Sequence, residues 1–255
     1  MEIVMLSSYK HDNLVSLIGF SDESDEKIIV YEHEVRGSLN KYLATTDLTW
    51  VQRLHICLGA ACGINYLHYD VGEGHRVLHR DIKSSNLLLN ENWEAKISDF
   101  GLSKIGPTNQ EFTFLVTNAC GTLGYIDPLY ATTDVLTKES DVYSFGVVLF
   151  EVLCGRLAVI KTFNDERRFL SKLAKLHYNE AKLYIFMFPL KSKGTKYNVS
   201  HWIKMRLNPG RNNSEKASRR RGFFWFTLTL PQGMFYLRLT CSSKLAHDLS
   251  IYNIK

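Results

Sequence analysis

Apolar and polar residues follow two different periods along the first 160 positions, and each period predicts a type of secondary structure. Runs of apolar and β-branched residues at 14–20 and 27–31 are separated by an acidic turn and predict a β-hairpin. Two shorter apolar runs at 87–89 and 96–97 flank a polar turn and predict a second hairpin. We therefore expect two small antiparallel pairs of strands in this part of the chain.

Other segments carry apolar residues at the three-to-four-residue spacing of a helix. Residues 2–9 predict a short helix, and Thr49 is suited to cap a longer one over 50–69, whose apolar residues predict a buried face. Residues 140–153 are apolar almost all round, which is typical of a helix in the middle of a fold. The stretch 102–118 shows little periodicity and is expected to be a loop.

After residue 160 the pattern weakens. The span 161–183 still allows one amphipathic helix that continues the preceding part, whereas 184–255 is a basic, aromatic tail with no sustained period. Within that tail, 223–230 is strongly strand-like. The predicted division of the chain is therefore 1–160, 161–183 and 184–255.

Composition narrows the class of protein. A hydrophobic content of 45% over 255 residues is enough for a sizeable core, and no run of about 18 apolar residues is present that would cross a membrane. The five cysteines include no CxxC pair, so the sequence indicates neither a zinc site nor a disulfide framework, and a reduced intracellular location is expected. The net charge of +5 divides into −9 over 1–160 and +14 over 161–255, which marks a boundary near residue 160.

The candidate chemistry lies at 79–86 (His-Arg-Asp-Ile-Lys-Ser-Ser-Asn) and at 98–101 (Ser-Asp-Phe-Gly). The second predicted hairpin lies between these stretches and holds its two ends on one side. Two carboxylates, an ammonium group and an amide in one small volume suit a magnesium-bound polyphosphate and a hydroxyl that must lose its proton. The side chains expected to converge there are Asp81, Lys83, Asn86 and Asp99.

The two stretches match the HRDLxxxxN and DFG signatures of protein kinases nearly letter for letter. On these motifs, and on further similarity elsewhere, residues 2 to about 160 resemble the kinase domain of plant receptor-like kinases, which are Ser/Thr kinases related to the animal Pelle kinases. The resemblance implies an α+β, protein-kinase-like fold with a mainly helical lower lobe. The further similarity lies at 14–19, 29–32, 121–125 and 140–146.

The resemblance also implies a role for each member of the expected cluster. Asp81 would orient the substrate hydroxyl and accept its proton, and Lys83 would steady the transferred phosphoryl group. Asn86 and Asp99 would hold two magnesium ions. The implied partners are ATP and a protein substrate, with a receptor kinase partner as a further candidate.

Residues on the nucleotide side carry over in the same way. Tyr31 resembles the gatekeeper at the back of the adenine pocket, and Glu32 to Glu34 resemble the hinge whose backbone bonds the base. Leu88 resembles the residue at the floor of that pocket. The resemblance therefore predicts that ATP lies between 31–34 and Leu88.

Regulatory positions also carry over. Glu2 resembles the glutamate of the regulatory helix. Arg80, which precedes the catalytic aspartate, implies control by phosphorylation of the activation loop, because a phosphate there can pair with the guanidinium. Thr117 is the preferred phosphate acceptor by position, followed by Thr113. Thr122 resembles the residue that meets the substrate beside the phosphorylated hydroxyl.

Departures from the family pattern favour an alternative function. The sequence starts at the regulatory helix, and it contains neither a Gly-rich loop nor a VAIK-like run, so we expect a truncated upper lobe with few strands and weak nucleotide binding. Leu129 stands where the family has a glutamate, and the late arginine that pairs with that glutamate is not recognisable. The alternative is a catalytically impaired pseudokinase or truncated gene product that acts as a scaffold or relic.

A third hypothesis concerns the basic tail. The cluster at 219–221 beside aromatic residues has the charge to bind nucleic acid or an anionic membrane, but the composition favours a solvated tail. The expected location is the cytoplasm, or the cytoplasmic side of the plasma membrane if the chain belongs to a larger receptor.

Overall fold

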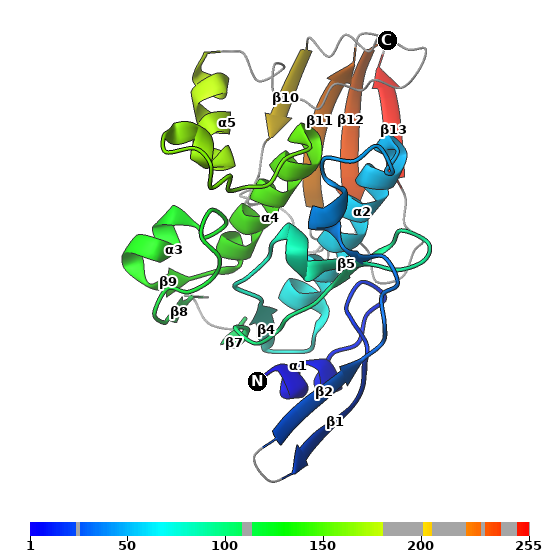
Figure 1. Ribbon diagram of the computed structural model, residues 1–255, viewed down its shortest axis with the longest axis vertical. Coiled ribbons are helices and arrows are strands. Elements are labelled where there is room, and N and C mark those ends of the chain that lie inside the picture. Colours follow the sequence, from blue (N-terminus) through cyan, green and yellow to red (C-terminus); the bar gives the residue numbers. More distant parts are fainter. Residues whose placement is uncertain are drawn as a thin grey trace, which may run out of the picture. The chain divides into compact units, whose positions relative to one another are not determined.

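The computed structural model describes residues 1–23, 26–108, 114–180, 201–205, 223–230, 233–240 and 249–254. It divides the chain into two compact units, Met1–Ser171 and Lys172–Lys255. Helices and strands are mixed in the first unit (Figure 1), as the expected α+β class requires. Among the helices that the structure describes, none combines the length and the hydropathy that crossing a bilayer requires.

The helices predicted at 2–9, 50–69 and 140–153 are present in the first unit, although the second of them continues as a π segment after Asn65. A short helix at 128–133 was not predicted. The α-helices are α1 (Glu2–Ser8), α2 (Trp50–Asn65), α3 (Pro128–Thr133) and α4 (Lys138–Cys154), and α5 (Leu170–Asn179) begins at the end of the unit. The 3-10 segments are η1 (Leu39–Tyr42), η3 (Ser84–Asn86) and η4 (Glu166–Arg168), and the π segment is η2 (Tyr66–Asp70).

The strands of the first unit pair antiparallel in small sheets. The predicted hairpins are both present. The pairs are β1 (Leu17–Glu23) with β2 (Glu26–Tyr31), β3 (Gly37–Ser38) with β5 (Leu87–Leu89) and then β6 (Ala95–Ile97), β4 (His75–Leu78) with β7 (Lys104–Pro107), and β8 (Leu115–Val116) with β9 (Val135–Leu136).

The prediction of a loop over 102–118 was wrong in part, because β7 and β8 lie within it. Each of these strands is short, and each pairs with a strand that is distant in the sequence. Hydrogen bonds to a distant strand need no alternation of apolar residues in so short a segment, so periodicity could not reveal them. Residues 109–113, including Thr113, lie outside the described residues.

Helix α2 begins as predicted. Thr49 and Gln52 form a reciprocal capping box, in which the Gln52 backbone N–H donates to the Thr49 hydroxyl at 3.2 Å. One residue of the predicted buried face was assigned wrongly, because Val51 is exposed. It lies in the first turn, before the helix enters the core, whereas Ile56 and Ile64 farther along are fully buried.

Helix α4 is the predicted central helix, and no residue from Ser140 to its end is exposed. Thr137 and Ser140 form a capping box at its start, and Gly155 closes its end with φ of +63°. Two acidic side chains of this helix, Asp141 and Glu151, are nevertheless buried. A charge in such a place needs partners, and these partners define the site described below.

The second unit contains a four-stranded antiparallel sheet in the order β10-β11-β12-β13. The sequence predicted the second of these strands. The strands are β10 (His201–Met205), β11 (Phe223–Leu230), β12 (Gly233–Thr240) and β13 (Leu249–Ile254). The basic cluster 219–221 lies outside the described residues.

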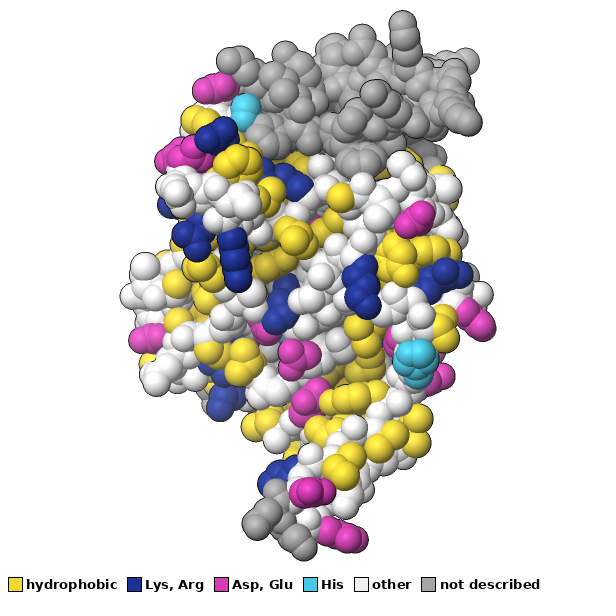
Figure 2. All heavy atoms as spheres, viewed as in Figure 1, with side chains coloured by type: hydrophobic (Ala, Val, Ile, Leu, Met, Phe, Trp, Pro, Cys, Tyr) yellow, Lys and Arg dark blue, Asp and Glu magenta, His cyan; other side chains and the backbone are white. Residues whose placement is uncertain are grey.

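The β1–β2 hairpin leaves large apolar side chains uncovered. It extends beyond α1 (Figure 1), and a space-filling view shows hydrophobic side chains gathered on it (Figure 2). The exposed fraction of Ile18 is 68% and that of Phe20 is 56%, and Ile28 and Val30 on the neighbouring strand are also exposed. The other face is only partly buried, and an isolated two-stranded hairpin is marginally stable in water.

Candidate active site

The catalytic loop, His79 to Asn86, is attached to α4 through one buried carboxylate. Asp141 accepts hydrogen bonds from the backbone N–H groups of His79 and Arg80, both at 2.8 Å, and from His68 Nε2 at 2.9 Å. Burial acts to raise the pKa of Asp141, but the hydrogen bonds and charge of His68 and its other donors bring the pKa below its ordinary value. The ionised carboxylate can therefore hold Arg80 at a φ of +73°, which is unfavourable for this residue type.

Asp81, Lys83 and Thr122 form a closed triangle of hydrogen bonds. The Lys83 ammonium donates to Asp81 Oδ2 at 2.6 Å and to Thr122 Oγ1 at 2.9 Å, and the Thr122 hydroxyl donates to Asp81 Oδ1 at 2.7 Å. The carboxylate of Asp81 is 6% exposed. Its orientation is thus fixed from two sides before any substrate arrives.

Asn86 and Asp99 complete the cluster. Asn86 Nδ2 donates to the Asp81 backbone carbonyl at 3.0 Å and lies 3.3 Å from both Asp81 Oδ2 and Asp99 Oδ2. Asp99 has a φ of +66°, so this member of the cluster, like Arg80 in the catalytic loop, is held in the left-handed region. The structure therefore brings together all four side chains that the sequence placed in one volume.

The oxygen atoms of this cluster fit magnesium. The Nδ2 atom of Asn86 is engaged as a donor, so its side-chain oxygen is left for a cation, beside the carboxylate of Asp99. No group of three or more His, Cys, Asp or Glu side chains in the described part of the chain is arranged to hold a metal. One or two carboxylates, with phosphate oxygens supplying the remaining ligands, are typical of magnesium bound with a nucleotide.

Arg80 extends from the same loop toward the activation segment. Its guanidinium donates to the Tyr130 hydroxyl at 2.7 Å and to the Asn118 carbonyl at 2.9 Å, and it lies 3.5 Å from the Thr117 hydroxyl. Thr117, the predicted acceptor, is thus within reach of the predicted cation. The contact with Tyr130 could not be found from the sequence, because it joins the catalytic loop to a residue of α3 that lies 50 positions away.

Comparison with known proteins identifies the chain's family. The model of the protein kinase domain matches residues 1–205. The chain is 48% identical over 198 residues to the receptor-like protein kinase FERONIA of Arabidopsis thaliana, covering 76% of this chain and 22% of that protein. It is 51% identical over 168 residues to the receptor-like protein kinase HERK 1 of the same plant, covering 65% of this chain and 20% of that protein.

The chain belongs to the protein kinase domain family. The predicted resemblance to plant receptor-like Ser/Thr kinases is confirmed, and by this relationship the chain is a protein kinase homologue. It spans about a fifth of the length of the curated relatives that it matches.

In this kinase domain Glu2 lies against the Ser-Asp-Phe-Gly segment. Its Oε1 atom accepts a hydrogen bond from the backbone N–H of Phe100 at 3.2 Å. Burial raises the pKa of the Tyr31 hydroxyl, and so do its hydrogen bond to Glu2 and the charge of Asp99. Helix α1, strand β2 and the predicted metal side of the kinase domain therefore meet at one carboxylate.

The predicted hinge follows Tyr31. The Glu32 backbone N–H donates to the Ser16 carbonyl, and the Glu34 carbonyl accepts from the Gly37 N–H, both at 2.9 Å. Burial raises the pKa of the Glu34 carboxyl group. Leu88 is half-buried in β5, the strand that pairs with Gly37 and its neighbour.

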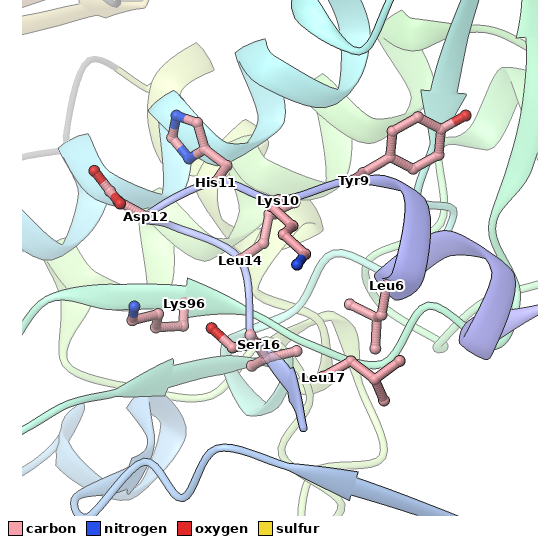
Figure 3. A pocket seen from close by; sticks show the side chains of 10 residues that line it. Leu6, Tyr9, Lys10, His11, Asp12, Leu14, Ser16, Leu17 and Lys96 are labelled. Carbon is pink, nitrogen blue, oxygen red and sulfur yellow. The ribbon is translucent and has the colours of Figure 1, made fainter. Parts of the chain in front are cut away.

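A cavity of about 340 Å³ lies at the end of α1, between Leu6, Leu17 and Lys96 (Figure 3). The chain that leads into β1 forms much of its wall, including Lys10 and Ser16. None of the four clustered catalytic side chains lines this cavity. It is therefore separate from the place where a hydroxyl and a phosphate would react.

Two residues of the kinase domain that the sequence reasoning did not single out for function are Tyr125 and Glu151. The Tyr125 hydroxyl donates to Glu151 Oε1 at 2.6 Å, and Glu151 is fully buried. One signal was available in the sequence, because an acidic residue interrupts the apolar face of 140–153. Its partner could not be found from the sequence, since the two lie in different elements.

Proposed function

We propose that this chain transfers the γ-phosphoryl group of ATP to Ser or Thr hydroxyls of proteins. The observation that carries the proposal is the arrangement of Asp81, Lys83 and Thr122, next to Asn86 and Asp99. Phosphoryl transfer depends mainly on positioning and on neutralising the charge that develops. A cluster with these groups, preorganised by α4, is suited to both tasks.

In this proposal Asp81 orients the substrate hydroxyl and accepts its proton. Thr122 and Lys83 fix the two carboxylate oxygens, so little reorganisation is needed when the hydroxyl arrives. Lys83 also brings a positive charge to the transferred phosphoryl group. Because Thr122 contacts Asp81 directly, it is placed to meet the residue that carries the accepting hydroxyl.

Asn86 and Asp99 would hold magnesium through their side-chain oxygens, and the Glu32–Glu34 backbone would bond the adenine beside Tyr31 and Leu88. Magnesium would neutralise charge on the phosphate oxygens when bound. Glu2 would keep the Ser-Asp-Phe-Gly segment in register through the Phe100 N–H.

Regulation would act through Arg80. A phosphate on Thr117 would lie beside a guanidinium that now donates to neutral oxygens of Tyr130 and Asn118, and a charged acceptor is the stronger one. We propose cytoplasmic action, on the inner side of the plasma membrane if the chain is part of a receptor. A protein substrate and a receptor kinase are the proposed partners.

The test compares the wild-type chain with Asp81→Asn, using radiolabelled ATP, magnesium and a mixed Ser/Thr peptide library. Loss of the proton acceptor should lower the transfer rate at least about 100-fold. Asp22→Asn is the matched control, because its side chain is 54% exposed on the hairpin and outside the cluster. Equal incorporation by wild type and Asp81→Asn would contradict the proposal and favour the alternative, an impaired kinase homologue that acts as a scaffold.

A further inference from the structure

Glu151 is a buried acid with a specific set of contacts. It lies near the end of α4 and has no exposed surface. Its Oε1 atom accepts hydrogen bonds from the Tyr125 hydroxyl at 2.6 Å and from the Ala158 backbone N–H at 2.7 Å. Its Oε2 atom is buried and has no hydrogen-bond partner of normal geometry in the described part of the chain. Ionising a carboxyl group placed this way is costly, because one of its oxygens would carry charge without a partner.

Tyr125 connects this carboxyl group to the catalytic loop. Its hydroxyl lies 3.4 Å from the Ser84 hydroxyl, and Ser84 is fully buried between Lys83 and Asn86 in the sequence. The Tyr125 carbonyl accepts a hydrogen bond from Ser144 of α4 at 2.8 Å. Tyr125 is thus held through its side-chain hydroxyl and through its backbone carbonyl.

The loop from Gly121 to Tyr125 carries Thr122, which contacts the catalytic carboxylate. Gly124 in this loop has a φ of +93°, and a Cβ atom there would overlap Val159. The loop therefore lies directly on the segment whose Ala158 N–H donates to Glu151. The carboxyl group of Glu151 therefore connects helix α4 with the loop that ends at Tyr125 and with the segment that contains Ala158.

We propose that Glu151 is a positioning residue, which fastens the substrate-facing loop Gly121–Tyr125 to the catalytic loop, and that a proton on its carboxyl group tightens this attachment. The inference concerns regulation of the site and rests on the proposed function for its kinetic part. Its structural part stands on the contacts of Glu151 alone.

The environment of Glu151 supports a protonated form near neutral pH. Burial raises its pKa to about 7, against hydrogen bonds from Tyr125, Ser84 and the Ala158 N–H, which lower it. Among the described residues, Tyr125 is the titratable group that faces it, and no cation forms an ion pair with it. The guanidinium of Arg156, the nearest cation along the chain, donates to the Arg167 carbonyl instead.

The direction of the pH effect follows from linkage. In an opened loop, where water reaches Glu151, the pKa returns to its ordinary value of 4.5, whereas in the closed loop it is about 7. The closed loop binds the proton more tightly, so raising the pH favours opening. Between pH 6 and pH 8 the opening equilibrium should increase about tenfold for these two pKa values.

The first experiment measures amide hydrogen exchange of the 121–126 segment in the full chain by mass spectrometry, from pH 5.5 to pH 8.5. Rates are divided by the intrinsic exchange rates at each pH. In wild type this segment should lose about tenfold of its protection between pH 6 and pH 8, and in Glu151→Gln protection should not change with pH. Glu139→Gln, on the exposed first turn of the same helix, should behave as wild type.

A second variant keeps the test independent of whether Glu151→Gln folds. Tyr125→Phe removes the hydroxyl that Glu151 holds and should speed exchange of the same segment at least about threefold at pH 6, with the β1–β2 hairpin unchanged. Wild-type protection that is independent of pH, or that changes equally in Glu151→Gln, would overturn the proposal.

Kinetics separate this inference from the proposed function. In wild type the KM for the peptide should rise between pH 6 and pH 8 more than the KM for ATP, and in Glu151→Gln this difference should disappear. Absence of any phosphoryl transfer, together with the expected exchange profile, would refute the proposed function and leave the positioning role standing. Transfer with identical pH profiles in wild type and Glu151→Gln would refute the positioning role.

Discussion

The catalytic loop and the β1–β2 hairpin are both short segments that the sequence indicated clearly, yet they are built in opposite ways. His79 is fully buried and Asp141, which holds its backbone, is 1% exposed. In the hairpin, Phe20 is 56% exposed and Ile18 is 68% exposed. The first segment is fixed by a buried carboxylate on a central helix, and the second by backbone pairing of two strands.

This difference shows which segments of the first unit have a strongly determined conformation. Hydrogen bonds to a buried ionised group are strong and leave one arrangement, whereas a two-stranded hairpin with uncovered side chains tolerates many substitutions. The catalytic loop and the side chains clustered with it should therefore be sensitive to small chemical changes. The hairpin should be insensitive to them.

The largest expected effect is that of Asp141→Asn. The substitution places an NH₂ group against two backbone N–H donors and removes the charge that pairs with His68. We expect the free energy of unfolding to fall by about 3–5 kcal/mol in urea denaturation. Asp22→Asn in the hairpin should change it by less than about 0.5 kcal/mol. Equal effects of the two variants would remove the contrast between the regions.

Substitution of two glycines, one packed against the catalytic loop and one in the hairpin, gives a second comparison between these two regions. Gly121 has a φ of +132°, and a Cβ atom there would lie 2.8 Å from the Arg80 carbonyl oxygen, whereas a Cβ atom at Gly19 of β1 would meet nothing within 4 Å. Gly121→Ala should lower the free energy of unfolding by about 2–4 kcal/mol, since backbone strain and a clash add. Gly19→Ala should lower it by less than about 0.5 kcal/mol. Thermal and urea unfolding measure the stability of both variants. A larger loss for Gly19→Ala than for Gly121→Ala would contradict the proposed difference between the two regions.

The pH dependence of stability should come from the helix and not from the hairpin. Glu151 has an ordinary pKa of 4.5 and a folded-state pKa of about 7, so its protonated form favours the folded state. That contribution is complete below about pH 4.5 and is lost as the pH rises to about 7. Between pH 5 and pH 8 the wild type should lose roughly 2 kcal/mol relative to Glu151→Gln. Parallel stability curves for the two proteins would contradict this assignment.

The smallest effect is expected where apolar side chains are most exposed. The double variant Phe20→Ser with Ile28→Thr should change the free energy of unfolding by less than about 0.5 kcal/mol, because both side chains are at least half exposed. It should also reduce the fluorescence of a bound hydrophobic dye, since exposed apolar area is removed. A loss above about 2 kcal/mol would show that the hairpin is packed as tightly as the catalytic loop.

In the second unit the apolar pattern of the sequence predicted only one of the four described strands. The sequence predicted β11, whose aromatic and β-branched residues are typical of a strand, and left β10, β12 and β13 unassigned. The described residues there form a register of antiparallel partners, with Phe223 opposite Thr240 and Leu230 opposite Gly233. Strands β10 and β13 are the edges of this sheet and β12 is paired on both sides, and all three are aligned by backbone pairing with a neighbouring strand, which a local apolar period does not reveal.

The sequence by itself determined the family, helix α2 with its cap Thr49, helix α4, and the convergence of Asp81, Lys83, Asn86 and Asp99. Motif spacing and the intervening hairpin suffice for that result, because they are local. The tertiary structure alone decided that the Thr122 hydroxyl donates to Asp81, that Arg80 donates to the Tyr130 hydroxyl, and that the Tyr125 hydroxyl donates to Glu151. These contacts join elements 26 to 50 residues apart, and their energy depends on burial, which no local pattern specifies.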